Sequence, residues 1–324
     1  MNKQRLPIAF DPIYAHPLPE GHRFPMIKYE LIPGQLLHEG LITEADLFSP
    51  KPCPPETILL THDHAYLQKL ENQTLSDKEQ RAIGFPQSPQ LTLREKIITQ
   101  GTIDCCLYAF GYERMDISRG GRWQTRPHHS GAGIALNVAG GTHHAFRDRG
   151  EGFCLLNDFA VAANWLLAEG LREKILIIDL DVHQGNGTAA IFRHDPRVFT
   201  FSMHGAHNYP FHKEVSDLDI PLPDGTDTST YLELLHENLD RILENFKPDF
   251  AFYLSGVDIL ETDKFGKLKV TMEGCAARDR YVFESLHRRK IPVVVSMGGG
   301  YSADHRIIVE AHCQTFRIAG QVFI

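Results

Sequence analysis

The chain has 324 residues, of which 42% are hydrophobic and 23% charged, a composition typical of a globular protein with a sizeable core. Its net charge of −8 at pH 7 argues against direct nucleic-acid binding, because no basic field is available to contact phosphates. It contains no apolar run of 18 residues, so we expect no membrane span, and its N-terminus lacks the apolar core of a signal peptide.

Short apolar runs predict buried strands at 175–180, 198–202, 249–255 and 292–297. A weaker run at 7–10 predicts an edge strand or the first strand. Continuous apolar strands are typical of a parallel sheet with both faces covered by helices. Helical patterns between them predict helices from the Asn157-Asp158 cap to Gly170, from Thr228–Thr230 to the residue before Pro248, and over 272–289.

The proline-containing stretches 50–57 and 84–91 predict loops rather than domain boundaries. There is no internal repeat and no linker-like composition. The alternation of strands and helices predicts an α/β fold with a mostly parallel central sheet, as one domain over 1–324. The six cysteines form no CxxC pair, which indicates reduced, packing thiols and a cytoplasmic location.

The run IIDLDVHQGNG (177–187) is the most informative stretch of the chain. It places Asp179, Asp181 and His183 on alternate residues as a buried strand ends, and a strand has a side-chain period of two. Neighbouring carboxylates in such a place need a compensating cation. Asp181 and His183 therefore predict half of a metal site, and a solvated strand end is the alternative.

Polar residues also follow the other predicted strands, and ligands bind at the carboxyl ends of strands in open α/β sheets. Asp258, in SGVDIL, is the natural third metal ligand, although it would also suit a helix N-cap. Two carboxylates and one imidazole suit Zn²⁺, while Fe²⁺, Co²⁺ or Mn²⁺ would fit the same donors.

Three further residues complete the predicted chemistry. The tandem His143-His144, in a glycine-flanked segment, suits a base and its partner beside a metal, with the upstream pair His128-His129 as a rival. Tyr301 ends the glycine run SMGGGY, which allows a tight turn that aims the phenol at a developing oxyanion. A phosphate-binding glycine loop is the alternative, but no GKS/T or GxGxxG pattern accompanies the run.

With these residues assembled, the chain resembles the histone deacetylase superfamily of zinc-dependent amidohydrolases, and is most similar to its class IV branch and bacterial relatives. The resemblance implies the three-layer arginase/deacetylase fold. It covers the central and C-terminal two-thirds of the chain. The motifs that carry it are GGTHHAF, GFCLLND, DLDVHQGNG, SGVDIL and GGGY, in the family's order.

The resemblance implies a role for each matching residue. It implies zinc ligation by three residues, Asp181, His183 and Asp258, and catalysis by His143, His144 and Tyr301, with His144 preferred as the general base and acid. It implies that Asp179 orients the first histidine. It also implies a structural K⁺ site and a narrow acyl-lysine channel. The K⁺ residues are Asp179, Asp181, His183, Ser202 and Met203, and the channel residues are Gly152, Phe153, Tyr209 and Gly299.

Two positions depart from the better-known members of the family. Asn186 stands where class I enzymes carry an aspartate facing the second histidine, which predicts a less basic His144. Around Tyr209 the sequence NYPFHKE lacks the usual glycines, which leaves the channel entrance and the substrate preference open.

The resemblance implies a deacylase that removes acetyl or longer acyl groups from the lysine ε-amine of proteins or peptides, with long-chain acyl groups favoured only by analogy to class IV. Deacetylation of acetylpolyamines or another small amine is the alternative within this fold. An arginase-like two-manganese enzyme is disfavoured because the DAHxD motif is absent. A catalytically silent acyl-lysine-binding protein is the alternative from another class.

Overall fold

A computed structural model describes residues 5–114, 123–125 and 133–324 of the chain. Its central element is an eight-stranded sheet in the order β2-β1-β5-β10-β9-β6-β7-β8, in which every neighbouring pair is parallel. The strands are β1 (Ile8–Ala9), β2 (Leu47–Phe48), β5 (Ile134–Asn137), β6 (Ile175–Asp179), β7 (Val198–Gly205), β8 (Leu218–Leu222), β9 (Phe250–Leu254) and β10 (Val293–Ser296). A separate antiparallel pair joins β3 (Tyr112–Arg114) to β4 (Trp123–Thr125).

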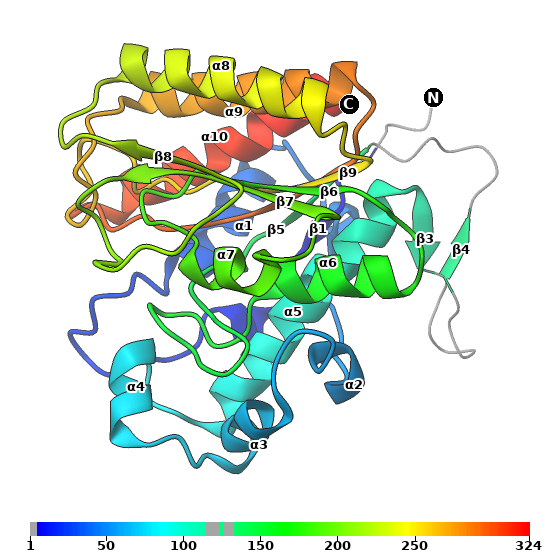
Figure 1. The fold of residues 1–324 in the computed structure, drawn as a ribbon, viewed down its shortest axis with the longest axis vertical. Coiled ribbons are helices and arrows are strands. Elements are labelled where there is room, and N and C mark those ends of the chain that lie inside the picture. Colours follow the sequence, from blue (N-terminus) through cyan, green and yellow to red (C-terminus); the bar gives the residue numbers. More distant parts are fainter. Residues whose placement is uncertain (1–4, 115–122, 126–132) are drawn as a thin grey trace.

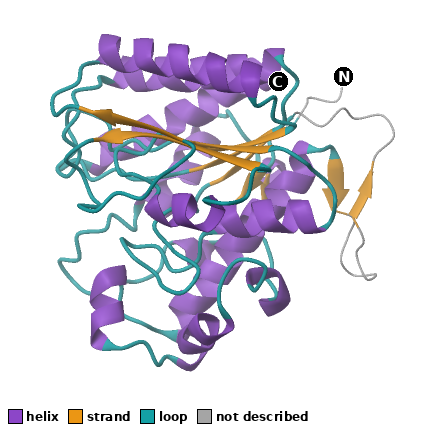
Figure 2. Cartoon of the chain, viewed as in Figure 1, coloured by secondary structure: helices purple, strands orange, loops and turns teal. Residues whose placement is uncertain are grey.

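Helices cover both faces of the sheet and produce three layers (Figures 1 and 2). Helices α8 (Thr228–Asn245), α9 (Met272–Arg288) and α10 (His305–Phe323) lie on one face. Helices α5 (Pro89–Ala109), α6 (Asp158–Ala168) and α7 (Asn186–Phe192) lie on the other. The remaining helices are α1 (Lys28–His38), α2 (Pro55–Ile58), α3 (His64–Asn72) and α4 (Asp77–Ile83), with 3₁₀ turns η1 (Pro12–Tyr14) and η2 (Glu44–Asp46).

The predicted fold is confirmed, and the local reasons are those that the sequence indicated. The predicted strands β6, β9 and β10 are buried at every residue, as expected for strands covered on both faces. Strand β5, which the sequence analysis did not predict, is buried in the same way. The three predicted helices begin at side-chain caps, in which Asn157, Asp227 and Thr271 each accept a backbone N–H from the first turn.

Several local expectations differ from the structure. Strand β1 lies between β2 and β5, so it is the first strand but not an edge. Residues 55–57 and 89–91, expected in loops, belong to α2 and α5. Both helices carry proline at the first helical position, where its missing N–H costs no hydrogen bond, so proline starts these helices instead of breaking them.

Other elements were not predicted because their burial differs from the simple patterns. Strand β8 is largely half-exposed at the edge of the sheet and contains Pro221, which only an edge strand or a bulge tolerates. Helix α5 buries most of its residues, including the polar Thr92, Arg94 and Glu95, so its sequence shows no apolar stripe. In the described part of the chain, no helix is long and apolar enough to cross a membrane.

Candidate active site

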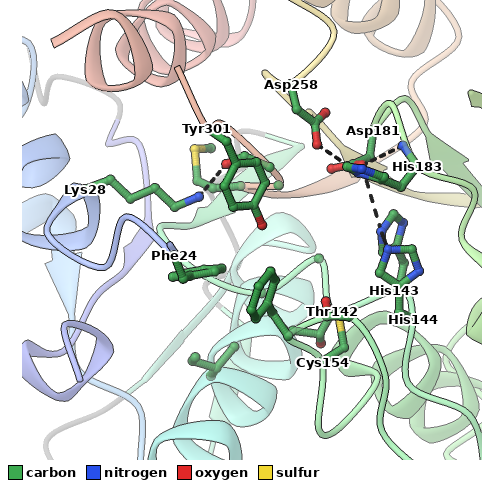
Figure 3. Close-up of a pocket in the computed structure, with 18 of the residues that line it drawn as sticks. Phe24, Lys28, Thr142, His143, His144, Cys154, Asp181, His183, Asp258 and Tyr301 are labelled. Atoms are coloured by element: carbon green, nitrogen blue, oxygen red, sulfur yellow. Dashed lines mark hydrogen bonds and ion pairs between the residues drawn. The ribbon is translucent and has the colours of Figure 1, made fainter. Parts of the chain in front are cut away.

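The predicted site residues follow β6, β9 and β10, which are adjacent strands of the sheet. Because these strands are parallel, their carboxyl ends meet at one edge, where Asp181, His183, Asp258 and Tyr301 line a single pocket. Figure 3 shows the two aspartates and His183 together on one side of this pocket, with Tyr301 facing them.

The strand argument for the metal ligands holds only in part. Strand β6 ends at Asp179, so Asp181 and His183 lie in the following loop. There, the Oδ1 atom of Asp179 accepts the N–H of Asp181 at 3.2 Å, and Oδ1 of Asp181 accepts the N–H of His183 at 2.9 Å. These carboxylate-to-backbone bonds, rather than the strand period, hold the loop and direct its side chains.

Asp181, His183 and Asp258 form a candidate metal site, because one possible ligand atom from each lies within 4.8 Å of the other two. His183 Nδ1 lies 3.0 Å from Asp181 Oδ1 and 3.2 Å from Asp258 Oδ2. Asp258 is fully buried, and among the described residues the close polar partner of its Oδ2 atom is the His183 ring. Two buried carboxylates and one imidazole thus converge, and this set of donors fits a divalent cation.

The electrostatics of these three residues also indicate a missing positive charge. Burial and the neighbouring Asp181 raise the pKa of Asp258 to about 7. Burial alone would lower the pKa of His183, but hydrogen bonds and the charges of the two aspartates raise it to about 10. The pKa of Asp181 is held below its usual range by His183 and His143 against the effect of burial. Without a metal, protons therefore balance the carboxylates.

Two predicted glycines bring backbone close to the site. Gly299 has φ +58°, and a Cβ atom there would lie 2.2 Å from Asp258 Oδ2. Gly152 has φ +53°, and a Cβ atom there would lie 2.6 Å from His144 Cδ2. Only glycine combines a positive φ with so close an approach to a neighbouring side chain. This explains why the motifs carry glycine at these two positions.

The tandem histidines meet through their Nε2 atoms, which are 3.1 Å apart. Each Nδ1 atom faces an oxygen: that of His143 lies 2.6 Å from Asp179 Oδ2, and that of His144 lies 2.7 Å from Asn186 Oδ1. Both Nδ1 atoms therefore carry hydrogen, and the Nε2 atoms turn toward the same point beside Asp181. His143 Nε2 lies 4.0 Å from Asp181 Oδ1.

The surroundings of His143 and His144 shift their pKa values in opposite directions. Burial disfavours charge on both, but the Asp179 carboxylate outweighs it and raises the pKa of His143 above 6.5. Burial and the neighbouring charges of His143 and His183 hold the pKa of His144 well below 6.5. That Asn186 makes His144 less basic than its class I counterpart stays a prediction, because the contact with Asn186 itself raises the pKa of His144. A pair of groups whose pKa values are pushed apart is typical of acid–base sites.

Tyr301 lies on the opposite side of the pocket with its hydroxyl group pointing into it (Figure 3). Burial and the charges of Asp258 and Asp181 raise its pKa well above 10, so the phenol keeps its proton at neutral pH. Its ring packs against Phe265, with ring centroids 4.9 Å apart, and its backbone N–H is held by Asp263 at 2.6 Å. The phenol is thus positioned as a hydrogen-bond donor.

The predicted channel residues are placed around the same pocket. Gly152, Phe153 and Gly299 line it, and the ring of Tyr209 packs edge-on against His144 with centroids 4.9 Å apart. Phe153 has φ +67°, and the Tyr209-Pro210 peptide bond is cis. The hydroxyl of Tyr209 donates to Glu151 Oε2 at 2.9 Å.

Of the residues predicted for a K⁺ site, three lie on the neighbouring strands β6 and β7, and Asp181 and His183 lie in the loop after β6. Asp179 of β6 is paired with Ser202 of β7, and Met203 follows it in the same strand. All three are buried. No potassium-to-oxygen geometry tests this prediction, which stays a prediction. The rival histidine pair, His128-His129, lies outside the described residues.

The pocket also contains residues that the sequence did not indicate. Phe24 and Lys28, from the segment that leads into α1, line its far side (Figure 3). Lys28 is 2% exposed and donates to the carbonyl oxygen of Gly299. Burial lowers the pKa of Lys28 to about 8. No pattern signals this residue, because a lysine at the start of a helix usually faces solvent.

The fold and this pocket define an α/β protein with a candidate metal site at the carboxyl edge of a parallel sheet. A family model described as "Histone deacetylase domain" matches residues 22–316. The chain therefore belongs to the histone deacetylase superfamily, a family of deacetylase hydrolases.

Individual relatives agree with this assignment. The chain is 40% identical to an uncharacterised protein of Picosynechococcus, over 98% of this chain and 99% of the relative. It is 29% identical to histone deacetylase 2 of Arabidopsis thaliana, over 90% of this chain and 72% of that protein.

Solved structures show the same fold. An HDAC homologue from Aquifex aeolicus is similar with a TM-score of 0.77 and 22% identity, over 97% of this chain and 83% of the other. An HDAC homologue complexed with SAHA gives a TM-score of 0.78 and 23% identity, over 98% and 84% of the two chains. At these identities the likeness concerns the fold alone.

Proposed function

We propose that this protein is a metal-dependent deacylase that hydrolyses the amide bond of acylated lysine in proteins or peptides. The observation that carries the proposal is the convergence of three kinds of group on one pocket. These are the metal-ligand trio of Asp181, His183 and Asp258, the paired Nε2 atoms of His143 and His144, and the buried phenol of Tyr301.

The metal is held by Asp181, His183 and Asp258 in this proposal, and Zn²⁺ suits these donors, with Fe²⁺ or another divalent metal as alternatives. When bound, it supplies a Lewis acid that polarises the amide carbonyl and acidifies water. A K⁺ ion near Asp179, Ser202 and Met203 would have a structural role.

The protein's own groups then move the proton and hold the developing charge. His144 is neutral at pH 7 because its pKa is lowered, so its Nε2 lone pair accepts the proton of the attacking water. Tyr301 donates a hydrogen bond to the carbonyl oxygen as negative charge develops there. His143, held by Asp179, stabilises the protonated pair, which returns a proton to the leaving amine.

The pocket wall supports a linear acylated amine as substrate. The rings of Phe24 and Phe153 approach to 5.2 Å between centroids, and Phe153 lies 6.3 Å from Tyr301, so aromatic faces surround the approach to the site. Such a wall suits the apolar methylene chain of a lysine side chain.

The six unpaired, buried cysteines support a reducing compartment such as the cytoplasm.

A turnover assay tests the proposal. The zinc-reconstituted protein is offered fluorogenic lysine peptides that carry acetyl, trifluoroacetyl, octanoyl or myristoyl groups, with Tyr301→Phe as the control. Chelator-sensitive turnover that the control lacks is the expected result, and the acyl profile identifies the preferred chain length. Turnover of acetylpolyamines alone would mean that the substrate is a small acylated amine and not acylated lysine. No turnover with either kind of substrate would contradict the proposal.

A further inference from the structure

Asn186 presents an ambiguity that an aspartate in its place would not. It is 2% exposed, it opens helix α7, and its Oδ1 atom lies 2.7 Å from His144 Nδ1. A carboxamide has one donor end and one acceptor end of nearly equal size. If the group turned over, Nδ2 would face His144 Nδ1, and the imidazole proton would have to move to Nε2.

That exchange would remove the lone pair on which the proposed chemistry depends. His144 Nε2 lies 3.1 Å from His143 Nε2 and faces the pocket. With hydrogen on Nε2, His144 would no longer accept a proton from water at that atom. The orientation of the Asn186 side chain therefore decides whether His144 acts as a base.

Glu151 lies against the other end of this carboxamide. Its Oε2 atom accepts from Asn186 Nδ2 at 3.4 Å and from the Tyr209 hydroxyl at 2.9 Å. Its Oε1 atom accepts from Arg149 Nε at 2.8 Å. An ionised carboxylate has no hydrogen to donate. A reversed Asn186 would set its own oxygen against Glu151 Oε2, so only the observed orientation is compatible with this neighbour.

We propose that Glu151 is a positioning residue that holds His144 in its Nδ1–H form through Asn186. The two histidines then reach the same state by different routes. His143 faces the Asp179 carboxylate directly at 2.6 Å. His144 faces the carboxamide of Asn186, and the orientation of that carboxamide is set in turn by the carboxylate of Glu151. The inference deepens the proposed function and rests on the role given there to His144.

The first test is the tautomer itself, read by NMR of the imidazole nitrogens in full-length, zinc-loaded protein labelled with ¹⁵N-histidine. The signals of His144 are assigned by their loss in His144→Gln. We expect hydrogen on Nδ1 alone in the unchanged protein, and a second population with hydrogen on Nε2 in Glu151→Ala. The inference is overturned if the Glu151→Ala spectrum keeps one Nδ1–H form, or if the unchanged protein already shows both.

The second test is a double-mutant comparison of kcat and KM. Glu151→Ala is expected to lower kcat about tenfold, with KM changed less than twofold, because partners behind a reactive group commonly matter 10- to 100-fold. Glu151→Gln keeps one acceptor oxygen but adds an amide end that can donate to a reversed Asn186, so it should recover kcat only in part. Asp148→Ala, which removes a carboxylate that pairs with the same Arg149 and keeps the Glu151–Asn186 contact, is the matched control.

Asn186→Asp supplies the decisive background. An aspartate needs no neighbour to select its orientation, so in this background Glu151→Ala should change kcat less than twofold. An equal loss in both backgrounds would show that Glu151 acts through Tyr209 or the pocket entrance, and would overturn the inference. If the unchanged protein turns over no acyl substrate, the proposed function fails, while the NMR test still decides the tautomer.

Discussion

The two sides of the pocket are built by different forces from different parts of the chain. The polar wall consists of Asp181, His183 and Asp258 on loops after neighbouring strands, with buried charges held by hydrogen bonds. The aromatic wall consists of Phe24, Phe153 and Tyr301, together with Lys28. Ring packing holds the three aromatic residues, and Lys28, at the start of α1, donates a hydrogen bond to the carbonyl oxygen of Gly299. We therefore expect the polar wall to control metal binding, and the aromatic wall to control turnover and stability.

The largest expected effect is on the polar wall. Asp258→Ala removes the buried carboxylate that faces His183 Nδ1 at 3.2 Å, so both the bound metal and all activity should be lost. Metal content after dialysis, measured by elemental analysis, and turnover check this result. The exposed Asp224→Ala serves as the control. Stoichiometric zinc in Asp258→Ala would contradict the expectation that the polar wall controls metal binding.

The next effect is on the aromatic wall. Tyr301→Phe removes one hydroxyl donor and should lower kcat by about 10²- to 10³-fold without loss of zinc. Tyr281→Phe, which removes a phenol that donates to Asp240 on the surface helices, should leave kcat unchanged. Steady-state kinetics and metal analysis of both variants test this. A loss of zinc in Tyr301→Phe would show that Tyr301 takes part in metal binding, the property that we assign to the polar wall.

Metal affinity should rise with pH. The raised pKa values of Asp258, about 7, and His183, about 10, mean that the metal-free folded protein holds protons that a cation must displace. The same shifts make the metal-free protein lose stability as pH rises from about 4 to 7 through Asp258 and from about 6.5 to 10 through His183.

Competition of a chelator for zinc at pH 6, 7 and 8 measures this dependence. Each displaced proton should tighten binding about tenfold per pH unit while its group remains protonated. Binding that does not change with pH would contradict the assignment of these two residues as ligands.

The smallest expected effect comes from Lys28→Met on the aromatic wall. The change leaves the half-buried carbonyl oxygen of Gly299 without this donor, which should lower the free energy of unfolding by about 1–3 kcal/mol with zinc content unchanged. Urea denaturation measures the loss. Lys51→Met, at an exposed lysine, should stay within about 0.5 kcal/mol. Equal stability of both variants would mean that Lys28 does not support the Gly299 turn.

The difference between the walls also explains what could be predicted. The polar wall follows strands whose apolar runs are visible in the sequence, and the carboxyl ends of adjacent parallel strands meet. Asp181, His183 and Asp258 could therefore be grouped before the structure was known, together with Tyr301 of the aromatic wall, which follows the adjacent strand β10. Phe24 and Lys28 could not, because their approach depends on how α1 packs across the molecule against α10, and local patterns carry no such information.

By itself, the sequence determined the α/β class, the buried strands β6, β9 and β10, the capped helices and the three residues of the candidate metal site. These depend on local periodicity, capping and the motif residues, which are local properties of the chain. The tertiary structure alone decided that β1 lies inside the sheet, that most of α5 is buried, and that Glu151 reaches Asn186 at the start of α7 from a separate loop. Those features depend on contacts between distant segments, whose geometry is set by packing of the whole domain.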